Sequence, residues 1–90
     1  MDIHFLKIVS EHYEAVDKGI KKAELRKNDR GFKVGDYMVL QEIYAKHPHL
    51  YTGRQLLCRI THILTDRQFG GLQEGYCIIS FDKKENFDEI

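Results

Sequence analysis

The sequence has no tryptophan and no long apolar run, since no uninterrupted stretch of apolar residues exceeds four, as in Tyr76–Ile79. A membrane-spanning helix needs about 20 mostly apolar residues in a row, so the pattern excludes one. The chain begins with Asp2 and His4, and no long apolar segment follows them, which does not match a secretory signal peptide. We therefore expect a cytoplasmic protein with no membrane partner.

Cysteine is scarce, and motifs for a metal or a cofactor are missing. Cys58 and Cys77 lie in apolar, strand-like runs, which predicts two buried, reduced thiols. His47–His49 carries two histidines around the only proline, with no further ligand at a known metal spacing. Gly70–Gly71 lacks the lysine and hydroxyl residue of a phosphate-binding loop. We expect neither a metal nor a cofactor.

A net charge is also absent, because 14 basic and 14 acidic residues balance. The charges are nevertheless segregated. Residues 18–33 carry seven basic residues against two acids, whereas residues 82–90 carry four acids against two lysines. Such a basic segment is typical of a protein that binds a polyanion, although a solvated surface can have the same composition.

The 90 residues predict one small α+β domain. The patterns indicate a helix over 10–18 and loops over 45–53 and 66–75. They also indicate strands over 3–8, 23–28, 37–44 and 76–81, with a further strand between the two loops. So many strands in a short chain favour a partly closed barrel of about five strands with one or two flanking helices, because closure removes exposed edges. We assign residues 1–82 to the domain and 83–90 to a charged, frayed tail.

The predicted helix has start and stop signals at its two ends. Ser10 is expected as its N-cap, and Gly19 as its left-handed end. Tyr13, Val16 and Ile20 recur at helical spacing and are expected to form its apolar stripe.

Two strands carry polar residues among apolar ones. In the strand after the helix, Ala23 and Leu25 are expected to face the core, while Glu24, Arg26 and Asn28 share the other face. In the fourth strand, alternation places the apolar residues on one face with His62, which is expected as a buried or rim histidine: Leu56, Cys58, Ile60 and Leu64.

Gly19–Arg26 matches the pattern G-x-K-x-x-E-x-R and resembles the signature of the ASCH domain, a branch of the PUA-like superfamily. Further similarity covers Glu24–Arg30, Val34–Asp36, Tyr51–Arg54 and Gly71–Tyr76, as in small bacterial and phage proteins with such a domain. The resemblance implies a PUA-like β-barrel with a helix beside a cleft. It also implies that the ligand is RNA or a modified nucleotide.

The residues of this motif suit that role. Lys21 can reach a phosphate, and Arg26 can grip a phosphate or stack on a base. Glu24 can accept hydrogen bonds from the amines of a base. The alternative interpretation is that Glu24 and Arg26 form a surface ion pair of small energy.

Further residues complete the expected binding surface. Asn28 can read a base edge, and Tyr76 or Tyr44 can offer a stacking face. Lys27 and Arg30 add positive charge, although alternation turns Lys27 away from the acid of the motif.

A hydrolase is the second hypothesis, although a binding protein is favoured over an enzyme. Some ASCH relatives are amidohydrolases of acetylated cytidine, in which a lysine works beside a threonine nucleophile and a later glutamate. Lys21 matches that lysine, whereas Glu24 stands at the threonine position and could activate a water directly. The later acid could be Glu42 or Glu74. A third hypothesis is a protein-binding adaptor that uses the acidic tail or the segment His47–Gly53.

Overall fold

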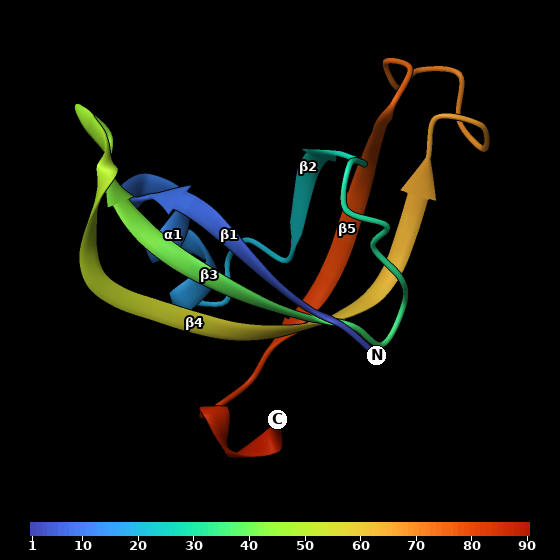
Figure 1. Ribbon diagram of the computed structural model, residues 1–90. Helices are drawn as coiled ribbons and strands as arrows, with labels where there is room; N and C mark the ends of the chain where they lie inside the picture. The colour runs from blue at the N-terminus through green and yellow to red at the C-terminus, as the bar shows by residue number, and fades with distance from the viewer.

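The computed structural model describes residues 1–90, except for the side chain of Glu89. Within this part, five strands, one α-helix and one 3₁₀ helix follow one another (Figure 1). In chain order they are β1 (Ile3–Val9), α1 (Ser10–Asp17), β2 (Ala23–Lys27), β3 (Tyr37–Tyr44), β4 (His47–Thr65), β5 (Tyr76–Lys83) and η1 (Phe87–Glu89). Neither of these helices has the length and apolar character that crossing a membrane requires.

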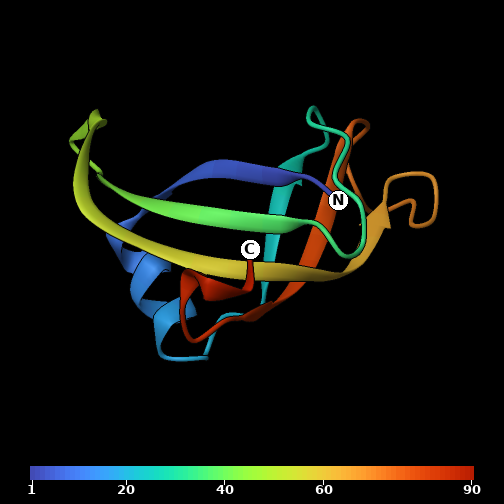
Figure 2. The same cartoon turned by 60° about the horizontal axis from the view of Figure 1, so that its bottom comes forward.

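The five strands form one mixed sheet in the order β1-β3-β4-β5-β2. β1 runs parallel to β3, and the other neighbouring pairs are antiparallel. The sheet curls into a half-barrel whose edges are β1 and β2 (Figures 1 and 2). The predicted α+β fold with five strands and a helix is confirmed at this level. In the described residues, no strand ladder closes the gap between β1 and β2.

The main core lies between the concave face of the sheet and α1, which packs on β1 and β3. Apolar side chains alternate along the strands, so that one face of each strand faces this core. The buried members are Leu6, Ile8, Tyr13, Val16, Phe32, Met38, Leu40, Leu56, Cys58, Ile60, Cys77, Ile79 and Phe81. Tyr37, Val39 and Leu57 form a second buried cluster from the opposite face of β3 and β4. Both faces of β3 therefore carry buried apolar residues. Both cysteines are free and buried, as expected.

The predicted loop over 45–53 is wrong, because only residues 45 and 46 form the turn and β4 already begins at His47. Proline lacks a backbone donor and is tolerated in a strand only at an edge or a bulge. The pairing passes from Ile43↔Tyr51 to Tyr44↔His47, so Pro48 falls in a register shift. A second shift between Gln41 and Ile43 leaves extra residues in β4, among them Gly53 with a φ of 97°.

The bulge in β4 directs two side chains onto the buried carboxylate of Glu42. The Thr52 hydroxyl donates to Oε1 of Glu42 at 2.7 Å, and Arg54 donates to both oxygens at 2.8 Å. These hydrogen bonds, from Arg54 above all and also from Thr52 and Ser10, outweigh burial and lower the pKa of Glu42 to about 2. Arg54 also donates to Glu14 of α1, so the Arg54 guanidinium joins the hairpin of β3 and β4 to the helix.

A bulge also explains why the prediction for His62 is wrong. The pairing of β4 with β5 shifts between Ile60 and His62. The extra residue reverses the alternation, so His62 is exposed and Ile63 packs against the core instead. Ile60 itself keeps the buried position that the sequence predicts.

Two predicted features of the helix are corrected, and two are confirmed. Ser10 is not the N-cap; Val9 is, and it makes no capping bond through its side chain. Ile20 lies beyond the helix and is 76% exposed, whereas Tyr13 and Val16 are buried as expected. Gly19 ends the helix with a φ of 74°, as predicted.

The C-terminal segment contains more structure than a frayed tail. β5 extends to Lys83, and the amide of Lys84 donates to the carbonyl of Leu57 at 2.8 Å. Residues 87–89 form η1, with Asn86 accepting from the Asp88 amide. The acidic tail of the sequence includes Glu89, whose side chain lies outside the described residues.

The carboxylate of Glu42 predicts a stability that depends on pH. The folded-state pKa of about 2 lies below the ordinary 4.5, so this contribution is complete above the ordinary value and lost as the pH falls toward the folded-state value. Glu42→Gln is expected to be less stable than the parent at neutral pH. The difference should shrink on acidification, as measured by urea unfolding down to about pH 2.

Glu74→Gln, in the exposed loop over 66–75, is the matched control and should follow the parent curve. A stability difference between parent and Glu42→Gln that stays constant with pH would contradict the assignment.

Candidate functional site

β2 turns the acid and the guanidinium of the motif toward the interior of the half-barrel. Glu24 pairs with Ile79, and Arg26 pairs with the buried Cys77, so both share the face of core residues. Leu25 points the other way and is 61% exposed. The prediction that Ala23 and Leu25 face the core is therefore wrong. β2 is an edge strand, and its inward face lies at the open side of the barrel, where polar groups can meet solvent.

Glu24 is held between two cations. Lys21 Nζ lies 3.0 Å from its Oε1, and Arg26 Nε donates to its Oε2 at 3.1 Å. Glu24 is only 8% exposed, and a buried carboxylate without partners would be strongly destabilising. Lys21 and Arg26 therefore neutralise a buried charge. Glu24 and Arg26 do form the ion pair of the alternative interpretation, but its carboxylate is buried rather than exposed at the surface.

Two arginines bridge the gap between the edge strands. Arg26 Nη2 donates to the carbonyl of Lys7 at 2.7 Å, and Arg30 Nη1 donates to the carbonyl of Phe5 at 3.1 Å. Both carbonyls belong to β1, which has no strand neighbour on this side in the described chain. Side chains thus satisfy backbone acceptors that a closed barrel would pair with another strand.

A hollow of about 450 Å³ lies at this gap, and we call it the seam hollow. Its lining comes from β1, α1 and the segment from Lys21 to the end of β2: Lys7, Ile8, Val9, His12, Lys21, Glu24, Leu25, Arg26 and Lys27. Four of these side chains are cationic and one is anionic, with His12 counted as neutral. The net charge of the lining is positive, which suits an anionic ligand.

The backbone fixes Lys21 at the entrance to β2. Gly19 turns the chain out of α1, and the amides of Ile20 and Lys21 both donate to the carbonyl of Ala15 at 2.9 Å. Because this connection is fixed, the Lys21 ammonium lies within reach of Glu24. This explains the spacing of Gly19, Lys21 and Glu24 in the motif.

The other predicted site residues do not all join this cluster. Lys27 pairs with Tyr76 on the outer face, although Lys27 still lines the rim of the seam hollow. Among the described residues, those that line the hollow do not include Tyr76, Asn28 or Arg30. The backbone amide of Asn28 donates to the carbonyl of Gly75.

Sequence reasoning missed Lys7 and His12, which line the seam hollow from β1 and α1. No local pattern marks them, because the fold of the whole chain brings them to Lys21. The Lys7 ammonium lies over the Tyr51 ring, 5.8 Å from its centroid. The acids proposed for a hydrolase also lie elsewhere: Glu42 is bound by Arg54, and Glu74 is exposed in a loop.

One group of side chains has the composition of a metal site. Single ligand atoms of Asp2, His4 and Asp36 all lie within 4.8 Å of one another. Asp36, however, already accepts from His4 Nε2 at 2.8 Å and from the amides of Asp2 and Lys33 at 3.0 Å. Burial raises the pKa of Asp36, but these hydrogen bonds outweigh it and lower the pKa overall. The hydrogen bonds that Asp36 accepts from Asp2 and His4 explain this group of side chains, because they fix the start of β1.

Comparison with known proteins finds a matching family model and a similar phage protein. A family model described as "Domain of unknown function (DUF3850)" matches residues 3–81. Over 61 residues the chain is 36% identical to the "Uncharacterized 12.9 kDa protein in GpA 3'region" of Escherichia phage P2. The match covers 68% of the chain and 53% of the phage protein, so the chain spans about half the length of this curated relative. The expected similarity to a phage protein is therefore found, whereas neither match names the ASCH domain or the PUA-like superfamily.

The bridge between the edge strands predicts unequal effects of two arginine substitutions. Arg26→Ala should lower the free energy of unfolding by about 1–2 kcal/mol, because it removes bonds to a buried carboxylate and a carbonyl. Arg30→Ala removes one bond at an exposed position and should cost less than about 1 kcal/mol. Urea unfolding measures both, with Arg67→Ala in the exposed loop as control. An Arg26→Ala protein as stable as the control would refute the bridging role.

Proposed function

The chain belongs to the DUF3850 family, and we propose that it is a nucleotide- or nucleic-acid-binding module, with RNA preferred, whose ligand occupies the seam hollow. The observation that carries this proposal is the lining of the hollow, in which four cationic side chains accompany one acid. Its volume of about 450 Å³ lies within the range of small-ligand pockets.

The residues of the hollow divide into two roles. Lys7, Lys21 and Lys27 are suited to contact phosphates as point charges. Glu24 holds Lys21 and Arg26 in place, and the free lone pairs of its oxygens can accept from the amines of a base. Arg26 is fixed by Glu24 and by the carbonyl of Lys7, so its planar group offers a preorganised surface for a base or a phosphate.

The resemblance of Gly19–Arg26 to the ASCH signature supports the same proposal. In this interpretation the half-barrel corresponds to a PUA-like fold, and the seam hollow corresponds to the implied cleft beside the helix. The position of Lys21, Glu24 and Arg26 together at a hollow is what such a motif would require.

A second candidate is hydrolysis of a modified base. The direct contact between Lys21 Nζ and Glu24 Oε1, at 3.0 Å beside the hollow, favours it. Glu24 would take a proton from a water that attacks an amide carbonyl of the ligand, and Lys21 would stabilise the developing negative charge. Because both carboxylate oxygens are already bound to cations, the binding function is the better supported of the two.

The binding function predicts that RNA affinity falls with salt and depends on two lysines of the hollow. Lys21→Ala and Lys7→Ala should each weaken binding of single-stranded RNA by roughly tenfold at low salt, since each removes a phosphate contact. Fluorescence anisotropy over a salt series measures the affinity. Lys46→Ala, at the exposed turn between β3 and β4, is the matched control.

Lys7→Ala leaves the cations of Glu24 in place, so a loss of affinity in this variant does not arise from disturbing the buried carboxylate. Affinities of both variants equal to that of Lys46→Ala would overturn the proposal.

The hydrolase function predicts release of acetate from acetylated cytidine or a related nucleoside. Turnover, followed by chromatography of the nucleoside product, should be abolished in Glu24→Gln and Lys21→Met, since each removes one member of the contacting pair. Glu74→Gln is the control and should retain full activity. Product formed at the parent rate by Glu24→Gln, or no product from a broad nucleoside panel, would eliminate this candidate.

A further inference from the structure

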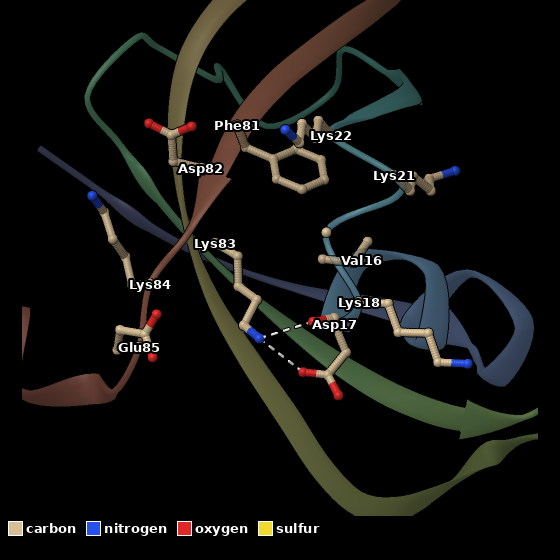
Figure 3. Close-up of a pocket in the computed structure, with 11 residues that line it drawn as sticks. Val16, Asp17, Lys18, Lys21, Lys22, Phe81, Asp82, Lys83, Lys84 and Glu85 are labelled. Atoms are coloured by element: carbon tan, nitrogen blue, oxygen red, sulfur yellow. Dashed lines mark hydrogen bonds and ion pairs between the residues drawn. The ribbon is translucent and has the colours of Figure 1, made fainter.

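A second hollow, of about 500 Å³, lies where α1 ends and β5 passes beside it; we call it the helix-end hollow (Figure 3). Its floor is apolar, since Val16 and Phe81 line it and are both buried. Apart from Gly19, the rest of its lining is charged: Asp17, Lys18, Lys21, Lys22, Asp82, Lys83, Lys84 and Glu85. Five of these eight side chains are lysines.

Two of the lysines are already paired, since Lys21 contacts Glu24 and Lys83 contacts Asp17. Lys83 Nζ donates to both the carbonyl and the Oδ1 of Asp17, at 3.0 Å in each case. This contact, drawn in Figure 3, neutralises Asp17 and joins the end of β5 to the end of α1. By contrast, Lys18, Lys22 and Lys84 form no ion pair within the described part of the chain.

The remaining charges separate onto two walls. Lys18, Lys21 and Lys22 come from the end of α1 and the connection to β2, on one side of the hollow in Figure 3. The opposite side, from the end of β5 and the residues after it, carries Lys84 together with two acids, Asp82 and Glu85. An anion in this hollow is therefore attracted to the wall at the end of α1.

Lys21 belongs to the lining of both hollows. The two hollows thus meet at the connection between α1 and β2, which the carbonyl of Ala15 holds in place through the amides of Ile20 and Lys21. The cations Lys18, Lys22, Lys21, Arg26 and Lys27 each line one or both of the hollows, and Glu24 lies between Lys21 and Arg26. One charged side chain shared by two adjoining sites fits a ligand that continues from one site into the next.

We propose that the helix-end hollow binds backbone phosphates of a single-stranded oligonucleotide, while a nucleotide of the same strand occupies the seam hollow. This inference rests on the proposed binding function and goes beyond it, because it names the ligand as a strand rather than a free nucleotide. A positively charged groove that follows the backbone is the usual device for binding single strands. A single strand can bend through two adjoining hollows, whereas a duplex presents its phosphates on a stiff cylinder.

The test compares a short ligand with a long one. Binding of a nucleoside monophosphate and of a single-stranded RNA of about ten nucleotides is measured by calorimetry and anisotropy at several salt concentrations. Lys18→Ala/Lys22→Ala removes two cations from the basic wall, and the control Lys46→Ala/Arg67→Ala removes two exposed cations that line neither hollow. The basic-wall variant should bind the RNA at least about tenfold more weakly, with the salt slope reduced by about 1.4, while its affinity for the monophosphate is unchanged.

The possible outcomes separate this inference from the proposed function. If the parent binds RNA and the monophosphate, but the basic-wall variant binds both as the parent does, the helix-end hollow is not a phosphate site and the inference fails alone. If the parent binds neither ligand, the proposed function fails and the inference fails with it. Equal affinity for a duplex of the same length, with the same loss in the basic-wall variant, would overturn the assignment to a single strand.

Discussion

The structure depends on hydrogen bonds that side chains make where a strand ladder is missing. Closing a five-stranded barrel would require its edge strands, β1 and β2, to pair with each other. Instead, Arg26 and Arg30 reach across and donate to carbonyls of β1. Because this bridge consists of side chains rather than backbone, it leaves room for the seam hollow, and it requires Glu24 inside to hold Arg26 in position.

The element types could be predicted from the sequence, since their periodicity and turn residues are local. Which face of β2 points inward could not be predicted. Apolar residues are expected to face the core, but the inward face of β2 lies at the open side of the half-barrel and carries Glu24 and Arg26, while Leu25 points outward. The bulges in β4 are a second cause of error. One extra residue reverses the alternation and exposes His62, while another register shift accommodates Pro48 within a strand. Both effects depend on the partner strand, which the local sequence does not contain.

The motif Gly19–Arg26 could be recognised in advance because its residues lie close together in sequence, and the structure does gather Lys21, Glu24 and Arg26. Two other segments of the resemblance have structural explanations. Tyr51–Arg54 supplies the partners of the buried Glu42, and Val34–Asp36 ends in the carboxylate that clasps the start of β1. Their spacing follows from the requirement that buried carboxylates be satisfied by hydrogen bonds.

The bridging arginines have a further consequence for how copies of this chain behave toward one another. An uncovered strand edge is a template onto which a strand of another molecule can add, and β1 combines such an edge with the exposed side chains of Ile3 and Phe5. Arg26 and Arg30 occupy two of its carbonyls with charged groups. The same guanidinium groups that complete the fold therefore also protect it from intermolecular strand addition, and hence from aggregation at high concentration.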